Sequence, residues 1–173
     1  MNSIMPPSLN RSRLAQLLQT EEQLFHQKHP KSHELYQRAR KSLHGGVPML
    51  WMIRWAGSFP VFVQSAKGAR FTDVDGNTYI AFCLGDTGAM TGHAPEATVQ
   101  AITAQAQKGI TLMLPYEDVI WVGEELQRRF GLPYWQFALT ATDANRFALR
   151  MARMLTGRPK ILVFNYCYHG TVD

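Results

Sequence analysis

The chain has few cysteines and no long apolar run. Its 173 residues include two cysteines, Cys83 and Cys167, which lie in different segments, outside any CxxC pair and away from paired histidines. This excludes a disulfide framework and a cysteine-histidine metal site. No apolar run approaches the roughly 20 residues of a membrane span, and the first residues do not form a signal peptide. We therefore expect a cytoplasmic protein without a metal and without a membrane partner.

Basic residues outnumber acidic ones, but they are spread along the chain. Lys and Arg total 18 against 13 Asp and Glu, for a net charge of +5. Apart from Arg38, Arg40 and Lys41 the basic residues are scattered, whereas a nucleic-acid site gathers them on one face. We expect mild attraction to small anions and no nucleic-acid partner.

The first 54 residues predict two amphipathic helices and a tryptophan-rich loop. Apolar residues recur at helical spacing from Leu14 to Leu43, with a break near Pro30. The loop "LWMIRWAG" then brings Trp51, Arg54 and Trp55 together. A guanidinium can clamp a carboxylate in two places and indoles can wall an apolar pocket, so these three residues are substrate-side candidates. A packed interface loop explains them equally well.

A small antiparallel meander is predicted next. Its three β-like runs are residues 60–64, 69–74 and 79–84. The last two runs are separated by "DGN", and Asp-Gly between alternating runs is typical of a hairpin. Asp73 and Asp75 resemble a carboxylate pair, but at this turn we interpret them as turn formers.

The rest of the chain predicts helices and a parallel pair of strands. Helices are expected over residues 97–108, 117–130 and 143–155, and strands over residues 135–140 and 160–165. A strand, a helix and a second strand in this order favour a parallel pair with a helical crossover. The predicted class is α/β: N-terminal helices and a small meander, followed by the start of a doubly wound, mostly parallel sheet.

The segment "TATDAN" lies where the predicted strand passes into the helix. In open α/β sheets ligands bind at the carboxyl ends of strands, and the first turn of a helix attracts anions through its free amides. Thr140 and Thr142 add hydroxyl groups, and small residues permit close approach. Two interpretations stay open: a phosphate site, or Thr142 as the N-cap with Asp143 as a favourable first-turn charge.

Six pieces of the sequence, in this order, resemble the class III aminotransferases, the pyridoxal-phosphate enzymes that include glutamate-1-semialdehyde aminomutase. The pieces are "GGV", "AKGARFTDVDGNTYI", "GDTGAMTGHAPE", "FALTATDANRFALRMAR", "TGRPKILVF" and "CYHG". The resemblance runs from about Tyr36 to the last residue and covers the first part of the family's length. It implies fold type I, with residues 1–101 on the small-domain side and residues 102–173 beginning the large cofactor-binding domain.

The resemblance also implies a cofactor site for pyridoxal 5'-phosphate (PLP). The family's usual Ser-Gly-Thr-Glu-Ala segment binds the cofactor phosphate, and by position this role falls on Thr140, Ala141 and Thr142. Tyr168 would cover one face of the pyridoxal ring, with His169 beside it. Ala141 stands where the family has glycine, which adds a methyl group at a point of close backbone approach.

Transamination, as the resemblance implies it, needs a lysine that forms a Schiff base with PLP, and an aspartate facing the ring nitrogen. Both are expected downstream of Asp173, so no catalytic residue is assigned in this chain, which alone would be inactive. The expected enzyme is an aminotransferase or aminomutase that acts on an amino acid or amino ketone as a homodimer. The alternative is a non-catalytic PLP- or phosphate-binding module or partner subunit.

Overall fold

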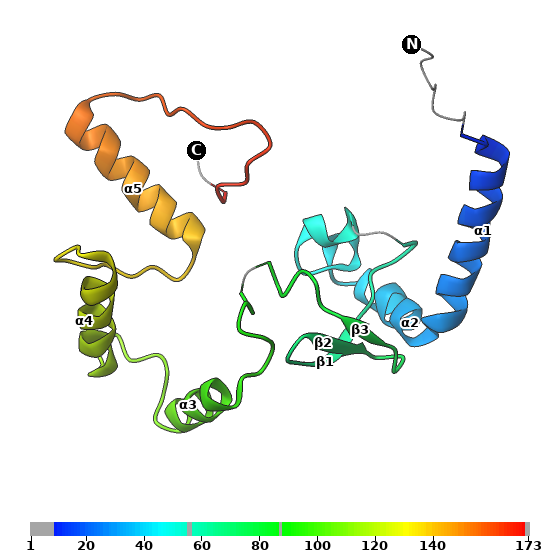
Figure 1. Cartoon of the computed structure of the whole chain (residues 1–173), viewed down its shortest axis with the longest axis horizontal. Helices are drawn as coiled ribbons and strands as arrows, with labels where there is room; N and C mark the ends of the chain where they lie inside the picture. Colours follow the sequence, from blue (N-terminus) through cyan, green and yellow to red (C-terminus); the bar gives the residue numbers. More distant parts are fainter. Residues whose placement is uncertain (1–8, 55–56, 87, 172–173) are drawn as a thin grey trace, which may run out of the picture. The chain divides into compact units, whose positions relative to one another are not determined.

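Figure 1 shows the computed structural model, which describes residues 9–54, 57–86 and 88–171. Its elements are α1 (Arg11–Lys28), α2 (Pro30–Ala39), the short 3-10 helices η1 (His44–Gly46) and η2 (Leu50–Arg54), β1 (Val63–Lys67), β2 (Arg70–Asp73), β3 (Thr78–Ile80), α3 (Glu96–Ala106), α4 (Asp118–Phe130) and α5 (Ala141–Thr156). The chain divides into two compact units, a first unit up to Ile110 and a second unit from Thr111. Within the described ranges, no helix is long and apolar enough to cross a membrane.

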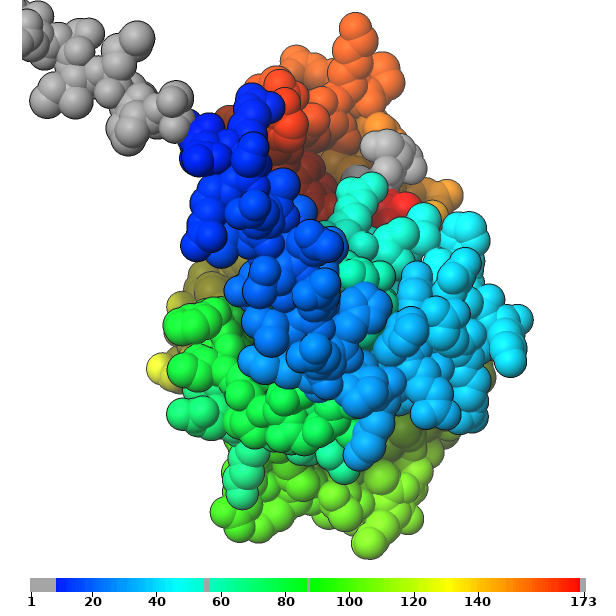
Figure 2. Space-filling view, turned by 90° about the vertical axis from the view of Figure 1, so that its right-hand side faces the viewer, coloured from blue at the N-terminus to red at the C-terminus, as the bar shows by residue number. Residues whose placement is uncertain are grey.

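The two N-terminal helices form as predicted, with their break at Pro30. The Asn10 side chain caps α1 by accepting a hydrogen bond of 2.9 Å from the Arg13 amide. Pro30 is the first residue of α2, where its missing amide proton costs nothing because that position has no partner inside the helix. All of α1 lacks a buried side chain, and Figure 2 shows it on the surface of the first unit. Phe59 is buried, and its ring packs against that of Phe25 at an interplanar angle of 49°, with ring centroids 4.7 Å apart.

The predicted meander is confirmed. The three strands pair antiparallel in the order β1-β2-β3. The first strand begins at Val63, three residues later than expected, and the third ends at Ile80, four residues earlier. Gly76 takes a φ of +89° in the turn between β2 and β3, a conformation that explains why the turn contains glycine.

Asp73 organises this turn, as its assignment to a turn former predicts. Its side chain is completely buried. One carboxylate oxygen accepts from the amides of Asp75 (3.0 Å) and Asn77 (2.8 Å), and the other accepts from Asn77 Nδ2 (2.9 Å) and the Tyr79 hydroxyl (3.0 Å). Burial by itself would raise the pKa of Asp73, but the bonds from Asn77, Tyr79 and Asp75 outweigh burial and lower it.

Asp75 ties the same turn to α2. Its carboxylate accepts hydrogen bonds from the amides of Lys31 (2.7 Å) and Ser32 (3.0 Å), in the first turn of that helix. A negative charge at a helix N-terminus is stabilising because it satisfies free amides. The hairpin therefore caps α2 from a distance in sequence.

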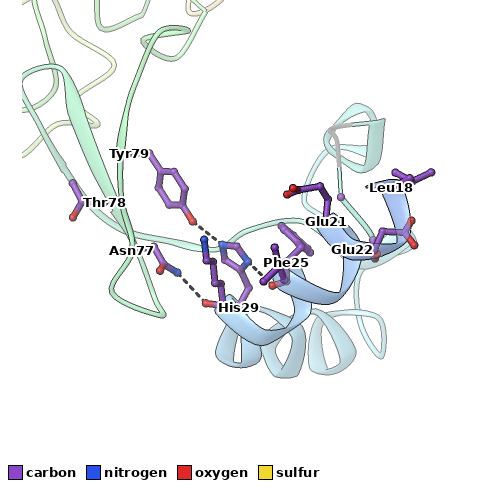
Figure 3. A pocket seen from close by; sticks show the side chains of 12 residues that line it. Leu18, Glu21, Glu22, Phe25, His29, Asn77, Thr78 and Tyr79 are labelled. Carbon is purple, nitrogen blue, oxygen red and sulfur yellow. Dashed lines mark hydrogen bonds between the residues drawn. The ribbon is translucent and has the colours of Figure 1, made fainter. Parts of the chain in front are cut away.

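His29 joins the break between the helices to β3. Its Nδ1 donates to the Phe25 carbonyl (2.7 Å), and its Nε2 lies 2.6 Å from the Tyr79 hydroxyl. Burial and the bond to Asp73 raise the pKa of Tyr79 to about 12. Phe25, His29 and Tyr79 line a cavity of about 700 Å³ between α1 and the hairpin, and Figure 3 shows the Tyr79 hydroxyl pointing toward His29.

The second unit contains α4 and α5 but lacks the two predicted strands. Residues 135–140 and 160–165 are described as irregular backbone, outside any sheet, so the predicted parallel pair is wrong for this structure. Apolar side chains in both segments are exposed, such as Leu139 and Leu162. A parallel strand forms only when a neighbouring strand accepts and donates its backbone hydrogen bonds, and an apolar run does not provide that neighbour. The helix ends are as predicted: Gly131 and Gly157 close α4 and α5 in the left-handed conformation.

Asp73→Asn should lower the free energy of unfolding by about 2 kcal/mol at pH 7, because an NH2 group replaces an oxygen that accepts buried hydrogen bonds. A carboxylate whose pKa is lowered in the folded state stabilises that state at pH values above its ordinary pKa. This stabilisation is lost as the pH falls through the folded-state pKa. The difference between wild type and Asp73→Asn should thus be full above about pH 5 and shrink below it.

Urea unfolding followed by circular dichroism between pH 2.5 and 7 measures this difference. Glu34→Gln, an acid-to-amide change at an exposed position on α2, is the matched control and should have little effect. A pH-independent difference between wild type and Asp73→Asn would contradict the role of the Asp73 charge.

Candidate functional site

The first turn of α5 is the centre of the candidate site, and it begins two residues earlier than predicted. Thr140, not Thr142, is the N-cap: its hydroxyl oxygen accepts from the Asp143 amide at 3.1 Å and donates to the Asp143 carboxylate at 2.8 Å. Asp143 is the third helical residue, and both its amide and its carboxylate are bonded to the Thr140 hydroxyl. The N-cap interpretation of Thr142 is therefore wrong, because Thr140 satisfies the helix end.

This capping leaves a specific set of donors at the helix end. The Asp143 amide binds the Thr140 hydroxyl, and the Ala144 amide binds the Thr140 carbonyl at 3.1 Å. The amides of Ala141 and Thr142 are the remaining first-turn donors, which the helix itself cannot satisfy. Ala141 is the first helical residue, so its methyl group brings no left-handed strain where the family has glycine.

The segment that carries Tyr168 and His169 returns to this helix end. Figure 1 shows the chain after α5 running back along the helix. The Thr171 amide donates to the Thr142 hydroxyl oxygen at 3.3 Å, and Asn145 Nδ2 donates to the His169 carbonyl at 2.8 Å. The two predicted parts of the cofactor site, residues 140–142 and residues 168–169, therefore lie together within the second unit.

Gly170 lies at the point of closest approach. Its φ is +88°, and a Cβ atom placed on it would meet the Thr142 hydroxyl and lie 2.9 Å from the Thr142 Cα. Both the conformation and the contact exclude a larger side chain. The glycine of "CYHG" is thus explained by packing against α5.

The side chains of Tyr168 and His169 are exposed. An exposed aromatic ring can cover a flat ligand, whereas a buried Tyr with a satisfied hydroxyl could not. For His169 the structure assigns the contact with α5 to its backbone carbonyl and not to its ring. The site thus offers two amides, small hydroxyl residues and one free aromatic face.

The substrate-side candidates belong to the first unit. Trp51 and Arg54 lie on η2, and Trp51 lines an apolar cavity of about 490 Å³ with Val47, Phe62 and Phe71. Trp55 lies outside the described residues. Across the described parts of the chain, no three histidine, cysteine, aspartate or glutamate residues are placed to hold a metal ion.

Comparison with known proteins identifies the family. The model of the aminotransferase class-III family matches residues 51–173. The chain belongs to the class-III aminotransferase family. Glutamate-1-semialdehyde 2,1-aminomutase of Methanocaldococcus jannaschii is 38% identical to it over 144 residues, covering 83% of this chain and 33% of the relative.

Solved structures of the family agree with this assignment. A glutamate-1-semialdehyde aminomutase from Pseudomonas aeruginosa PAO1 is 52% identical, with a TM-score of 0.89 over 95% of this chain and 36% of that one. A variant of that enzyme has been solved in complex with PMP. A transaminase with PLP bound is 34% identical, with a TM-score of 0.77 over 83% of this chain and 34% of that one. These neighbours confirm fold type I, and the chain spans about a third of the length of these class-III relatives.

Asn145 is a residue of the site that the sequence analysis missed. It lies one helical turn after Thr142, and residues three apart share a face of a helix. The spacing from Thr142 is the one feature of the sequence that points to Asn145. Its hydrogen-bond partner is a backbone carbonyl 24 residues away. No local pattern reveals such a partner.

Gly170→Ala should detach residues 169–171 from α5, because the methyl group meets Thr142 and the left-handed backbone is strained. We expect the exchange of the Thr171 amide hydrogen to accelerate by about tenfold or more, as measured by hydrogen exchange. Gly131→Ala is the matched control, since Gly131 has a φ of +70° with open space around it. Unchanged protection of Thr171 in Gly170→Ala would show that the contact is not required.

Proposed function

We propose that this chain provides the phosphate-binding and ring-covering part of the PLP site in a class-III aminotransferase or aminomutase. The observation that carries the proposal is the attachment of the Tyr168 segment to the first turn of α5 within one unit. The amides of Ala141 and Thr142 and the Thr142 hydroxyl would hold the phosphate, while Thr140 caps the helix that presents them. Tyr168 would cover the ring, with His169 beside it. PLP is the cofactor named in the solved relatives.

The donors at the helix end fit a phosphate monoester. Two first-turn amides and the helix dipole favour an anion, and the Thr142 hydroxyl can donate while its oxygen accepts from Thr171. Asp143 is the unfavourable charge nearby, but its carboxylate is engaged by the Thr140 hydroxyl. The residues present therefore suit a ligand with a phosphate at one end and a flat ring at the other.

When bound, PLP supplies an electron sink that makes the alpha proton of an amine substrate acidic. The residues of this chain contribute binding and orientation to that chemistry. The amides of Ala141 and Thr142 fix the phosphate, and Tyr168 limits the ring to one plane by covering a face. The substrate is proposed to be an amino acid or amino ketone, with Trp51, Arg54 and Trp55 as the substrate-side candidates.

The reacting lysine is proposed to lie beyond Asp173. Lys160 is the single lysine in the sequence of the second unit. It follows Pro159, whose carbonyl accepts from Arg153 in the last turn of α5, so it lies at the opposite end of a helix of 16 residues, about 24 Å long. Peptide mapping after treatment with PLP and borohydride tests this: a stoichiometric label on Lys160 would contradict it.

The family match favours an enzyme over the alternative of a non-catalytic PLP-binding module. Small-molecule amino donors and acceptors are the proposed partners. Assembly as a homodimer, a cytoplasmic location and the domain boundary at residue 102 stay predictions.

The chain should bind pyridoxamine 5'-phosphate (PMP) at least about tenfold more tightly than pyridoxamine, which lacks the phosphate. Thr142→Val should lower the affinity for PMP by roughly fivefold, since at nearly constant shape it removes a hydroxyl that can donate to the phosphate and that accepts from the Thr171 amide. Thr142→Ser, which keeps the hydroxyl, is the control. Equilibrium dialysis measures all four affinities. Equal binding of PMP and pyridoxamine would place the phosphate elsewhere and overturn the proposal.

A further inference from the structure

We propose that Asn145 is a positioning residue that holds Tyr168 at a fixed distance from the phosphate-binding end of α5. The inference rests on the proposed function, because it assumes that the ligand joins these two points. The Asn145 side chain donates its hydrogen bond to a backbone carbonyl and not to the Tyr168 ring. It acts through the backbone of His169, the neighbour of Tyr168.

Two side chains of α5 hold residues 169–171 against the helix. Thr142 and Asn145 are three residues apart and thus share one face of the helix. Asn145 Nδ2 binds the His169 carbonyl at 2.8 Å, and the Thr142 hydroxyl oxygen binds the Thr171 amide at 3.3 Å. Gly170 packs against Thr142 between these bonds.

The Asn145 bond is the one nearest to Tyr168, and it is the shorter of the two. The Thr171 bond holds the far side of Gly170, a residue with wide backbone freedom. Without Asn145, Tyr168 would be separated from its nearest anchor by this glycine and could swing away from the helix end. A ring held in advance binds its ligand more tightly than one that must be ordered on binding.

The choice of side chain matters for the test. A carbonyl can only accept, so residue 145 must donate, and an amide does so without charge. Leucine has nearly the shape of asparagine and no donor. Glutamine keeps the donor on a longer stem. Aspartate is unsuitable because its charge would repel the phosphate directly.

The experiment measures binding of PMP and of inorganic phosphate to the full chain as wild type, Asn145→Leu, Asn145→Gln and Arg150→Gln. PMP binding is also followed by the circular dichroism induced in its ring absorption, which reports a ring held in an asymmetric site. In Asn145→Leu we expect PMP affinity to fall roughly fivefold to tenfold and the induced signal to weaken, with phosphate affinity within about twofold of wild type. Asn145→Gln should recover part of the signal. Arg150→Gln, an exposed change on the same helix, should match wild type.

The outcomes separate the two claims. If wild type binds neither PMP nor phosphate, the proposed function fails. If wild type binds both and Asn145→Leu binds PMP with unchanged affinity and signal, only the positioning role fails. An equal loss of phosphate and PMP affinity in Asn145→Leu also overturns the positioning role, because it would show that Asn145 supports the helix end and not the ring.

Discussion

The proposed cofactor site depends on the close contact between Gly170 and Thr142. This contact brings the segment after the last helix back to the first turn of α5, and the bonds of Asn145 and Thr142 hold it there. Without the contact the chain would have a helix end that attracts anions and a separate exposed tyrosine. With it, the two parts of the proposed cofactor site are held against one another. A residue larger than glycine could not make this approach.

In the first unit, the buried side chain of Asp73 holds the turn between β2 and β3 together. Its carboxylate accepts hydrogen bonds from the amides of its own turn and from the side chains of Asn77 and Tyr79. Through Tyr79 and His29 the turn is also joined to the break between α1 and α2. The partners of Asp73 lie two to six residues along the chain, whereas Asn145 and Thr142 bind residues 24 and 29 positions further on.

Local signals in the sequence predicted the elements whose causes are local. Pro30 separates two helices, the Asp75-Gly76 turn joins two strands, and Gly131 closes a helix, each because of its own conformational preference. The strands expected at residues 135–140 and 160–165 failed because strand formation requires a neighbour that the pattern does not identify. At the site, the residues of the family motif were predictable, whereas the capping by Thr140 and the bond from Asn145 depend on contacts in space.

The most direct test of a PLP site at the start of α5 is nuclear magnetic resonance of the isotope-labelled chain during titration with inorganic phosphate and with PMP. We expect both ligands to shift the amide signals of Ala141 and Thr142 most strongly, and PMP alone to shift the ring protons of Tyr168 as well. If the largest shifts arise away from the first turn of α5, or if PMP leaves Tyr168 unchanged, the proposed site is contradicted.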